Sequence, residues 1–232
     1  MTRRRRHSEV VNILAVSDER SSLLLNEEAR ARLGRIDLLL GCGDLPYTYM
    51  EHLFTVLRTR HAYYVHGNHD APIHLSGGRL LTEPGGWENV DGRSVYVADF
   101  DLLIAGLEGS IRYRPGRPYQ YTQQEMTVRA QRLVLNLLYN RVAFGRYLDI
   151  FIAHAPPFGI QDGEDLPHQG FTFFRTLIQR FRPRLFLHGH LHRYGQEPWR
   201  TKVGETEVVN VFPFRLIHWR EGEIEYNRLY RR

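Results

Sequence analysis

The stretch Gly67-Asn68-His69-Asp70 lies one residue beyond the apolar run 62–65, which has the composition of a buried strand. In a layered α/β protein, the loops at the carboxyl ends of strands collect reactive side chains. A glycine in such a loop lets the backbone approach an ion or a phosphate closely. The stretch therefore places an amide, an imidazole and a carboxylate where chemistry is expected, although a polar turn after a strand is more often only a turn.

The same pattern recurs along the chain, because four other apolar runs also end in polar side chains. The segments 21–33 and 47–59 have helical composition, which predicts consecutive strand-helix units and a largely parallel sheet. We therefore expect the polar strand ends to gather at one edge. The four runs and the side chains that follow them are 10–16 with Asp18, 36–40 with Asp44, 148–153 with His154, and 185–187 with His190 and His192.

The segments between these runs carry simpler signals. Thr122 and Glu125 have the spacing of a capping box, and the apolar spacing after them predicts the longest helix of the chain. The glycine-rich segment 75–91 is expected to be a surface loop, and the long loop 158–170 is expected to form a wall of a site. Further expected elements are a hairpin over 94–98 and 102–106, a helix over 171–181, and short strands over 206–211, 215–219 and 223–230.

Size and composition predict one globular domain. The chain has 232 residues, 42% of them hydrophobic, and we expect a single domain over 9–232 after a disordered basic tail over 1–8. No apolar run has membrane-spanning length, and no hydrophobic segment resembles a secretory signal, which predicts a cytoplasmic protein without membrane association. The single cysteine, Cys42, excludes an internal disulfide and is expected to be a small buried hydrophobe.

The basic charge argues weakly for a nucleic-acid partner. The formal net charge is +5, and all but one of the 31 lysine and arginine residues are arginine. These cations are scattered along the chain apart from the run Arg3 to Arg6, whereas a nucleic-acid surface needs a continuous basic path. We therefore interpret the charge as general composition and predict no nucleic-acid partner.

The chemistry of the strand ends indicates a metal site. Carboxylate, amide and neutral imidazole groups are ligands for divalent ions of intermediate hardness, such as Mn, Fe or Zn. One or two such ions per chain are expected. Two ions roughly 3.5 to 4 Å apart can clamp a phosphoryl group and lower the pKa of a bound water.

At this point the sequence resembles the calcineurin-like metallophosphoesterase superfamily, over nearly its whole length. The resemblance implies a four-layer α-β-β-α sandwich of two mixed sheets flanked by helices, with the separate C-terminal strands in the second sheet. It also implies a phosphoesterase that uses a metal-activated water. The successive motifs of the family correspond here to Asp18-Glu19-Arg20, Gly41-Cys42-Gly43-Asp44, Gly67-Asn68-His69-Asp70, His154 and Gly189-His190-Leu191-His192.

The resemblance assigns roles by position. His69 is similar to the family histidine that stabilises the transferring phosphoryl group or protonates the leaving oxygen. Asp70 is then a candidate partner that orients the His69 ring, because the other nitrogen of an imidazole sets its tautomer. The implied metal ligands are Asp44 as the bridging carboxylate, Asn68, His154 and His190 in the second site, and Asp18 and His192 in the first site.

Arg20 departs from the family pattern, which usually reads Asp-x-His in the first motif. A guanidinium does not deprotonate at workable pH and cannot ligate a metal, so the first site lacks one ligand. Both sites could bind metal with water in the gap, only the second could be filled, or Arg20 could pair with Asp18 and Asp44 and replace a cation. We favour a weakened or vacant first site. The alternative is a catalytically degenerate relative that serves as a binding or scaffolding module.

Three further residues are candidates for substrate contacts. Arg112 and Tyr113 open a segment that interleaves cations with aromatic rings, a composition suited to holding a phosphate and stacking on a ring. The simpler interpretation, which we prefer, is an ordered loop whose tyrosines pack on the core. His168 lies in the loop 158–170 and is a candidate for rim contact with a small phosphoester. The family resemblance favours diesters over monoesters, and the oligomeric state is left open.

Overall fold

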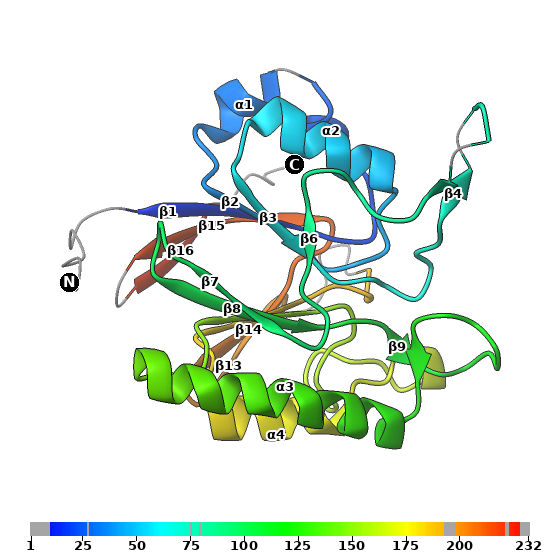
Figure 1. The fold of residues 1–232 in the computed structure, drawn as a ribbon, viewed down its shortest axis with the longest axis vertical. Helices are drawn as coiled ribbons and strands as arrows, with labels where there is room; N and C mark the ends of the chain where they lie inside the picture. The colour runs from blue at the N-terminus through cyan, green and yellow to red at the C-terminus, as the bar shows by residue number, and fades with distance from the viewer. Residues whose placement is uncertain are drawn as a thin grey trace.

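Two mixed six-stranded sheets face each other in the computed structural model, and helices cover their outer faces (Figure 1). The expected α-β-β-α sandwich is therefore confirmed. The expected basic tail lies outside the residues that the structure describes. These are residues 10–26, 28–74, 76–78, 80–192, 198–220 and 223–227.

The first sheet contains the strands that precede the motifs of the N-terminal half. Its order is β16-β15-β1-β2-β3-β6, in which β1, β2, β3 and β6 run parallel, β15 is antiparallel to β1, and β16 is antiparallel to β15. The predicted parallel arrangement of the first three strands is thus confirmed. The strands are β1 (Val11–Val16), β2 (Leu38–Gly41), β3 (His61–Tyr64), β6 (Glu88–Asn89), β15 (Phe214–Arg220) and β16 (Glu223–Asn227).

The second sheet contains strands from the segment 94–210. Its order is β13-β14-β12-β11-β8-β7, with a parallel centre and an antiparallel strand at each edge. The expected hairpin is confirmed as β7 and β8. The strands are β7 (Ser94–Val97), β8 (Leu102–Leu107), β11 (Ile150–Ala153), β12 (Leu185–His188), β13 (Arg200–Val203) and β14 (Thr206–Asn210).

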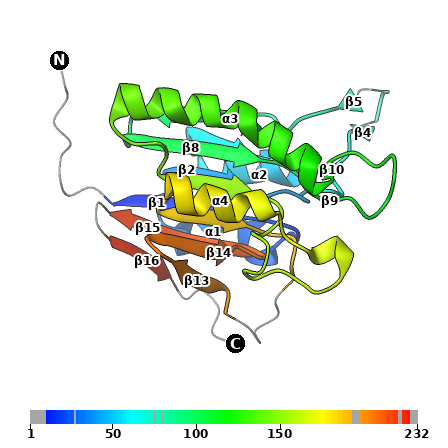
Figure 2. The same ribbon diagram turned by 90° about the horizontal axis from the view of Figure 1, so that it is seen from below.

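Four helices form the two outer layers. The pair α1 (Glu28–Leu33) and α2 (Tyr47–Leu57) covers the first sheet, and α3 (Gln123–Phe144) and α4 (Thr172–Phe181) lie side by side on the second (Figures 1 and 2). The predicted capping box starts α3, because the Thr122 side chain accepts from the Glu125 N–H and the Glu125 side chain accepts from the Thr122 N–H. None of the described helices is long and apolar enough to cross a membrane.

Three hydrophobic layers hold the sandwich together. One lies between the two sheets, and the other two lie beneath the α1–α2 and α3–α4 pairs. Strand residues alternate between these layers: Ile13 faces the other sheet, whereas its neighbour Leu14 packs under the helices. Cys42 is fully buried between the sheets, as expected for a small hydrophobe. Two sheets buried on both faces give the rigid support on which the loops at their ends are built.

Two expectations about the fold were wrong. The segment 75–91 is not only a loop, because β6 extends the first sheet beside β3, and β4 (Ile73–His74) pairs with β5 (Leu80–Leu81). The C-terminal strands were expected in the second sheet, but only β14 among them belongs to it. β15 and β16 extend the first sheet, in which β15 pairs with β1. Both errors concern which strands pair with each other, and that choice depends on tertiary packing.

Candidate metal centre

The carboxyl ends of five parallel strands bring the predicted ligands together from both sheets. Asp18, Asp44 and Asn68 follow β1, β2 and β3, and His154 and His190 follow β11 and β12. Three of these residues, Asp18, Asp44 and His190, have positive φ angles of 63°, 58° and 69°. Such a backbone is costly for a residue with a side chain and collects at functional sites. These three turns direct the side chains of Asp18, Asp44 and His190 toward the space between the strand ends.

The second predicted site is compact. The His154 Nε2 atom lies 3.0 Å from the Asn68 Oδ1 atom and 3.4 Å from the Asp44 Oδ2 atom. One ligand atom from each of Asp44, His154 and His190 lies within 4.8 Å of the other two. Four side chains from four different strands therefore surround a single point.

His154 shows that this point attracts a cation. Its Nδ1 atom lies 2.8 Å from the Cys42 carbonyl oxygen, which can only accept, so Nδ1 carries a hydrogen. Its Nε2 atom faces the oxygens of Asn68 and Asp44. Full burial alone would lower the pKa of His154, but the charges of Asp44 and Asp18 raise it to about 9. The oxygens of Asn68 and Asp44 therefore favour positive charge at the position that they share with His154.

The other members of the cluster are held ready for a ligand role. Burial alone would raise the pKa of Asp44, but the charge of His154 and the His69 N–H lower it to about 2, so the carboxylate is ionised. The His190 Nε2 atom donates to the Pro167 carbonyl over 2.7 Å, which leaves its Nδ1 lone pair free. Burial and the charge of His154 lower the pKa of His190 to about 3, so its ring is neutral. A carboxylate, an amide oxygen and two imidazoles fit a divalent ion of intermediate hardness.

The first predicted site is more open. Asp18 has a nearly buried side chain whose two oxygens accept from the His190 N–H over 3.1 and 3.0 Å. The His192 Nε2 atom lies 3.6 Å from Asp18 Oδ1, and its half-exposed ring stacks on Phe212. A Cβ atom on Gly189 would lie 2.4 Å from an Asp18 oxygen, so only glycine allows this approach. Two of the expected first-site ligands are therefore adjacent.

Arg20 does not fill the gap at the first site. It is exposed, and among the described residues its guanidinium makes no ion pair with Asp18 or Asp44. One of the three possible outcomes was that Arg20 pairs with both carboxylates and replaces a cation. No described contact supports that outcome.

The loop 67–70 is held in place by hydrogen bonds between backbone N–H groups and the carboxylates of two aspartates. The Asp70 Oδ2 atom accepts from the N–H groups of Gly67 and Asp44 over 2.7 and 3.1 Å, and Asp44 Oδ1 accepts from the His69 N–H over 2.8 Å. A Cβ atom on Gly67 would lie 2.0 Å from Asp44 Oδ1. Burial and the charge of Asp44 raise the pKa of Asp70 to about 6. The bonds of Asp70 thus go to the backbone, and among the described contacts none reaches the exposed His69 ring.

The three candidates for substrate contact lie in different settings. The Tyr113 hydroxyl accepts from the Asn68 side-chain amide over 3.2 Å, and the His168 ring packs beside His190 with centroids 5.2 Å apart. The loop 158–170 therefore borders the cluster, as expected for a wall. The Arg112 guanidinium is already engaged within the protein, because it donates to the Gln120 carbonyl and pairs with Glu125.

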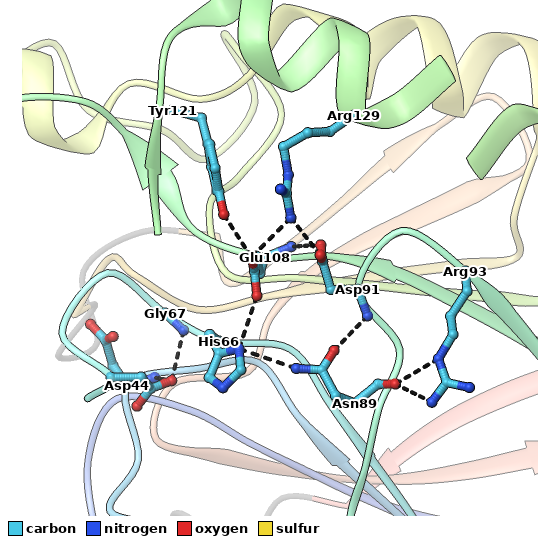
Figure 3. A network of polar contacts seen from close by, with 10 residues as sticks. Asp44, His66, Gly67, Asn89, Asp91, Arg93, Glu108, Tyr121 and Arg129 are labelled. Carbon is cyan, nitrogen blue, oxygen red and sulfur yellow. Dashed lines mark hydrogen bonds and ion pairs between the residues drawn. The ribbon is translucent and has the colours of Figure 1, made fainter. Parts of the chain in front are cut away.

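A buried ionic network, which the sequence did not indicate, lies next to the loop 67–70 and supports it. Figure 3 shows His66, the residue before Gly67, with its Nδ1 atom 2.9 Å from the Glu108 carboxylate. Arg129 descends from α3 and pairs with both Glu108 and Asp91. Glu108 also accepts from the Tyr121 hydroxyl over 2.6 Å. Single residues spread over 66–129 carry no motif, so no sequence signal could have assembled this network.

This network predicts a stability effect at Glu108. Glu108→Ala is expected to lower the free energy of unfolding by about 3 kcal/mol, because His66, Tyr121 and Arg129 lose a buried partner while Arg129 keeps Asp91. Denaturant unfolding measures the change. Glu28→Ala is the matched control, since Glu28 pairs with Arg32 on an exposed helix face and should cost under about 0.5 kcal/mol. Equal losses in the two variants would contradict a supporting role for the network.

The fold and this cluster together define a class of protein. A sandwich of two mixed sheets with carboxylate, amide and imidazole groups at the ends of parallel strands is a metallophosphoesterase-type structure. The sequence model of the calcineurin-like phosphoesterases matches residues 13–194, and the chain belongs to this family.

Solved structures share this fold. The crystal structure of TT1561 of Thermus thermophilus aligns with a TM-score of 0.60 and 22% identity, covering 94% of this chain and 99% of that one. A second crystal structure aligns with a TM-score of 0.64 and 15% identity over the same shares of both chains. At these identities the likeness is one of fold alone. No functionally curated protein matches the chain significantly.

Proposed function

We propose that this chain is a metal-dependent phosphoesterase that hydrolyses phosphodiesters in preference to phosphomonoesters. The observation that carries the proposal is the convergence of Asp44, Asn68, His154 and His190 on one point. Family membership supports the phosphoester class. The preference for diesters rests on the resemblance of the motifs to those of the wider superfamily.

Each residue has a defined task in this proposal. Asp44, Asn68, His154 and His190 would hold the divalent ion, which can be Mn, Fe or Zn. When bound, such an ion neutralises phosphoryl charge and lowers the pKa of a coordinated water.

The His69 side chain, exposed beside the cluster, would stabilise the phosphoryl oxygens or give a proton to the leaving oxygen. Its position is set by the backbone bond from its N–H to Asp44. Asp70 keeps this loop in place through the N–H groups of Gly67 and Asp44.

The activity is tested by comparing two aryl substrates at a fixed concentration of free Mn²⁺. We expect a higher kcat/KM for bis(4-nitrophenyl) phosphate than for 4-nitrophenyl phosphate, and loss of both activities in excess EDTA. Turnover that survives EDTA would contradict the metal requirement. A larger kcat/KM for the monoester would overturn the diester preference and leave the metal requirement standing.

The second candidate function is a binding or scaffolding module, and Arg20 is the observation that favours it. The residue stands where the family motif supplies a histidine, and it is exposed and unpaired with the nearby carboxylates among the described contacts. A protein with metal bound but without turnover on either aryl substrate would favour this candidate.

Arg20→His tests what the missing ligand does. An imidazole at this position is expected to raise the metal content from about one toward two ions per chain and the diesterase rate about tenfold, since the first site gains a ligand. Arg20→Gln is the control, because it removes the same charge without adding an imidazole. Two firmly held ions in the unmodified protein would contradict a weakened first site.

A further inference from the structure

The segment 112–119 leaves the sandwich beside the metal centre and returns to it. It connects β9 (Ser110–Ile111) to β10 (Gln120–Tyr121), and in both views it projects past the ends of the sheets (Figures 1 and 2). We name residues 112–119 the arm.

The base of the arm is fixed by a buried glutamine. The Gln120 side chain is only 3% exposed, and its Oε1 atom accepts from the N–H groups of Tyr113 and Arg114 over 3.3 and 3.0 Å. The Arg112 guanidinium donates to the Gln120 carbonyl and pairs with Glu125 at the start of α3. These bonds give the arm a defined shape at its base.

Two tyrosines tie the arm to the motif loop. The Tyr113 hydroxyl lies 3.2 Å from the Asn68 side-chain nitrogen, so the arm touches a predicted metal ligand. Tyr119 stacks on His66 with ring centroids 4.3 Å apart and planes at 12°. Both ends of the arm are therefore anchored beside the candidate metal centre, and residues 114–118 lie between these two anchors.

The middle of the arm carries two exposed cations. Arg114 and Arg117 are exposed, and among the described residues neither has a carboxylate partner, in contrast to Arg112. The Arg114 guanidinium lies 5.6 Å from the centre of the Tyr113 ring. Exposed arginines are common in this chain, but these two stand on a braced segment that contacts the candidate metal centre.

We infer that the arm binds a second anionic group of the substrate, a phosphate that lies beyond the scissile one. Guanidinium groups bind phosphate oxygens in a bidentate manner, and two of them on one short segment favour a ligand with more than one phosphate. The inference rests on the proposed function in that the scissile phosphate binds at the metal centre. It narrows the substrate class to esters with neighbouring phosphates, as in pyrophosphate-linked or polyphosphorylated compounds.

Binding of simple anions tests this inference without turnover. The full chain is titrated calorimetrically with phosphate and with tripolyphosphate, without added metal, so that free ions do not chelate the probe. We expect tripolyphosphate to bind more tightly than phosphate. The double variant Arg114→Gln/Arg117→Gln should weaken tripolyphosphate binding about tenfold and change phosphate binding less than twofold.

The control removes two equivalent charges elsewhere. Arg30 and Arg132 are exposed on α1 and α3, and Arg30→Gln/Arg132→Gln should leave both affinities within twofold of the unmodified protein. Equal weakening in the two double variants would overturn the inference, because it would reduce the effect to net charge. Equal affinity of the unmodified protein for the two anions would overturn it as well.

Hydrolysis of bis(4-nitrophenyl) phosphate separates this inference from the proposed function. That substrate has a single phosphate, so the arm variant should hydrolyse it at the rate of the unmodified protein. If the protein hydrolyses this diester but the arm variant binds tripolyphosphate as tightly as the unmodified protein, the inference is overturned and the proposed function stands. Arm-dependent binding in a protein without turnover supports the arm as an anion site and overturns the proposed function alone.

Discussion

Asp44→Asn is expected to lower metal affinity by at least about a hundredfold and diesterase turnover by about a thousandfold. Asp44 is the only carboxylate in the described metal cluster, and its Oδ2 atom faces His154 while Oδ1 accepts from the His69 N–H. Asparagine keeps an acceptor for that N–H but removes the negative charge that attracts the ion. The loop should therefore keep its conformation while the site loses its cation.

Metal analysis and steady-state kinetics on the same preparations measure both effects. Asp99→Asn is the matched control, because Asp99 is an exposed carboxylate that pairs with His61 away from the cluster. The control should keep the metal content and turnover of the unmodified protein. An Asp44→Asn protein that retains both would show that this carboxylate holds no ion needed for the reaction.

His69→Gln is expected to lower kcat about 10²- to 10³-fold while leaving the metal content unchanged. His69 has an exposed side chain beside the cluster, and among the described hydrogen bonds it holds Asp44 through its backbone N–H alone. The substitution therefore removes a proton donor and a positive partner for the phosphoryl group without removing a ligand. This separation of turnover from metal content distinguishes His69 from the ligands.

His74→Gln provides the comparison, because His74 is an exposed histidine on β4. It should behave like the unmodified protein in both measurements. If His69→Gln also lost the metal, the ring would have to be assigned a ligand role in place of an acid or electrostatic one. If neither variant changed kcat, His69 would have no part in the chemistry.

The sequence was informative wherever function depends on residues close to one another in the chain. Apolar runs that end in polar residues identified the strands that carry Asp18, Asp44 and His154, and the capping box at Thr122 located the start of α3 correctly. These signals are local, because a strand end or a helix cap is determined within a few residues. The set of side chains that meet at the centre could therefore be named before their geometry was known.

The sequence was uninformative wherever the outcome depends on contacts between distant segments. The pairing of β15 with β1 and of β6 with β3 is decided by packing across the whole sandwich, and the residues of one strand do not specify its partner. The same limit applies to side chains with several possible partners. Asp70 was expected to orient His69, but its hydrogen bonds go to the N–H groups of Gly67 and Asp44.

The sequence of the arm predicted that its cations and aromatic rings could contact a substrate, but it did not predict which arginine would do so. Arg112 was a candidate for substrate contact, yet its guanidinium is used by Gln120 and Glu125. Its neighbour Arg114 carries no carboxylate partner among the described residues. Which of two cations so close in sequence remains available depends on the direction of each side chain in the folded loop, and the order of residues does not specify that direction.

The central claim is that one divalent ion is held by Asp44, Asn68, His154 and His190. Elemental analysis of the unmodified chain and of the Asp44→Asn variant, both purified without chelator and then supplied with Mn²⁺ and desalted, tests it most directly. The account predicts at least one ion per unmodified chain and close to none in the variant. Equal metal contents in the two proteins, whether both high or both near zero, would contradict it.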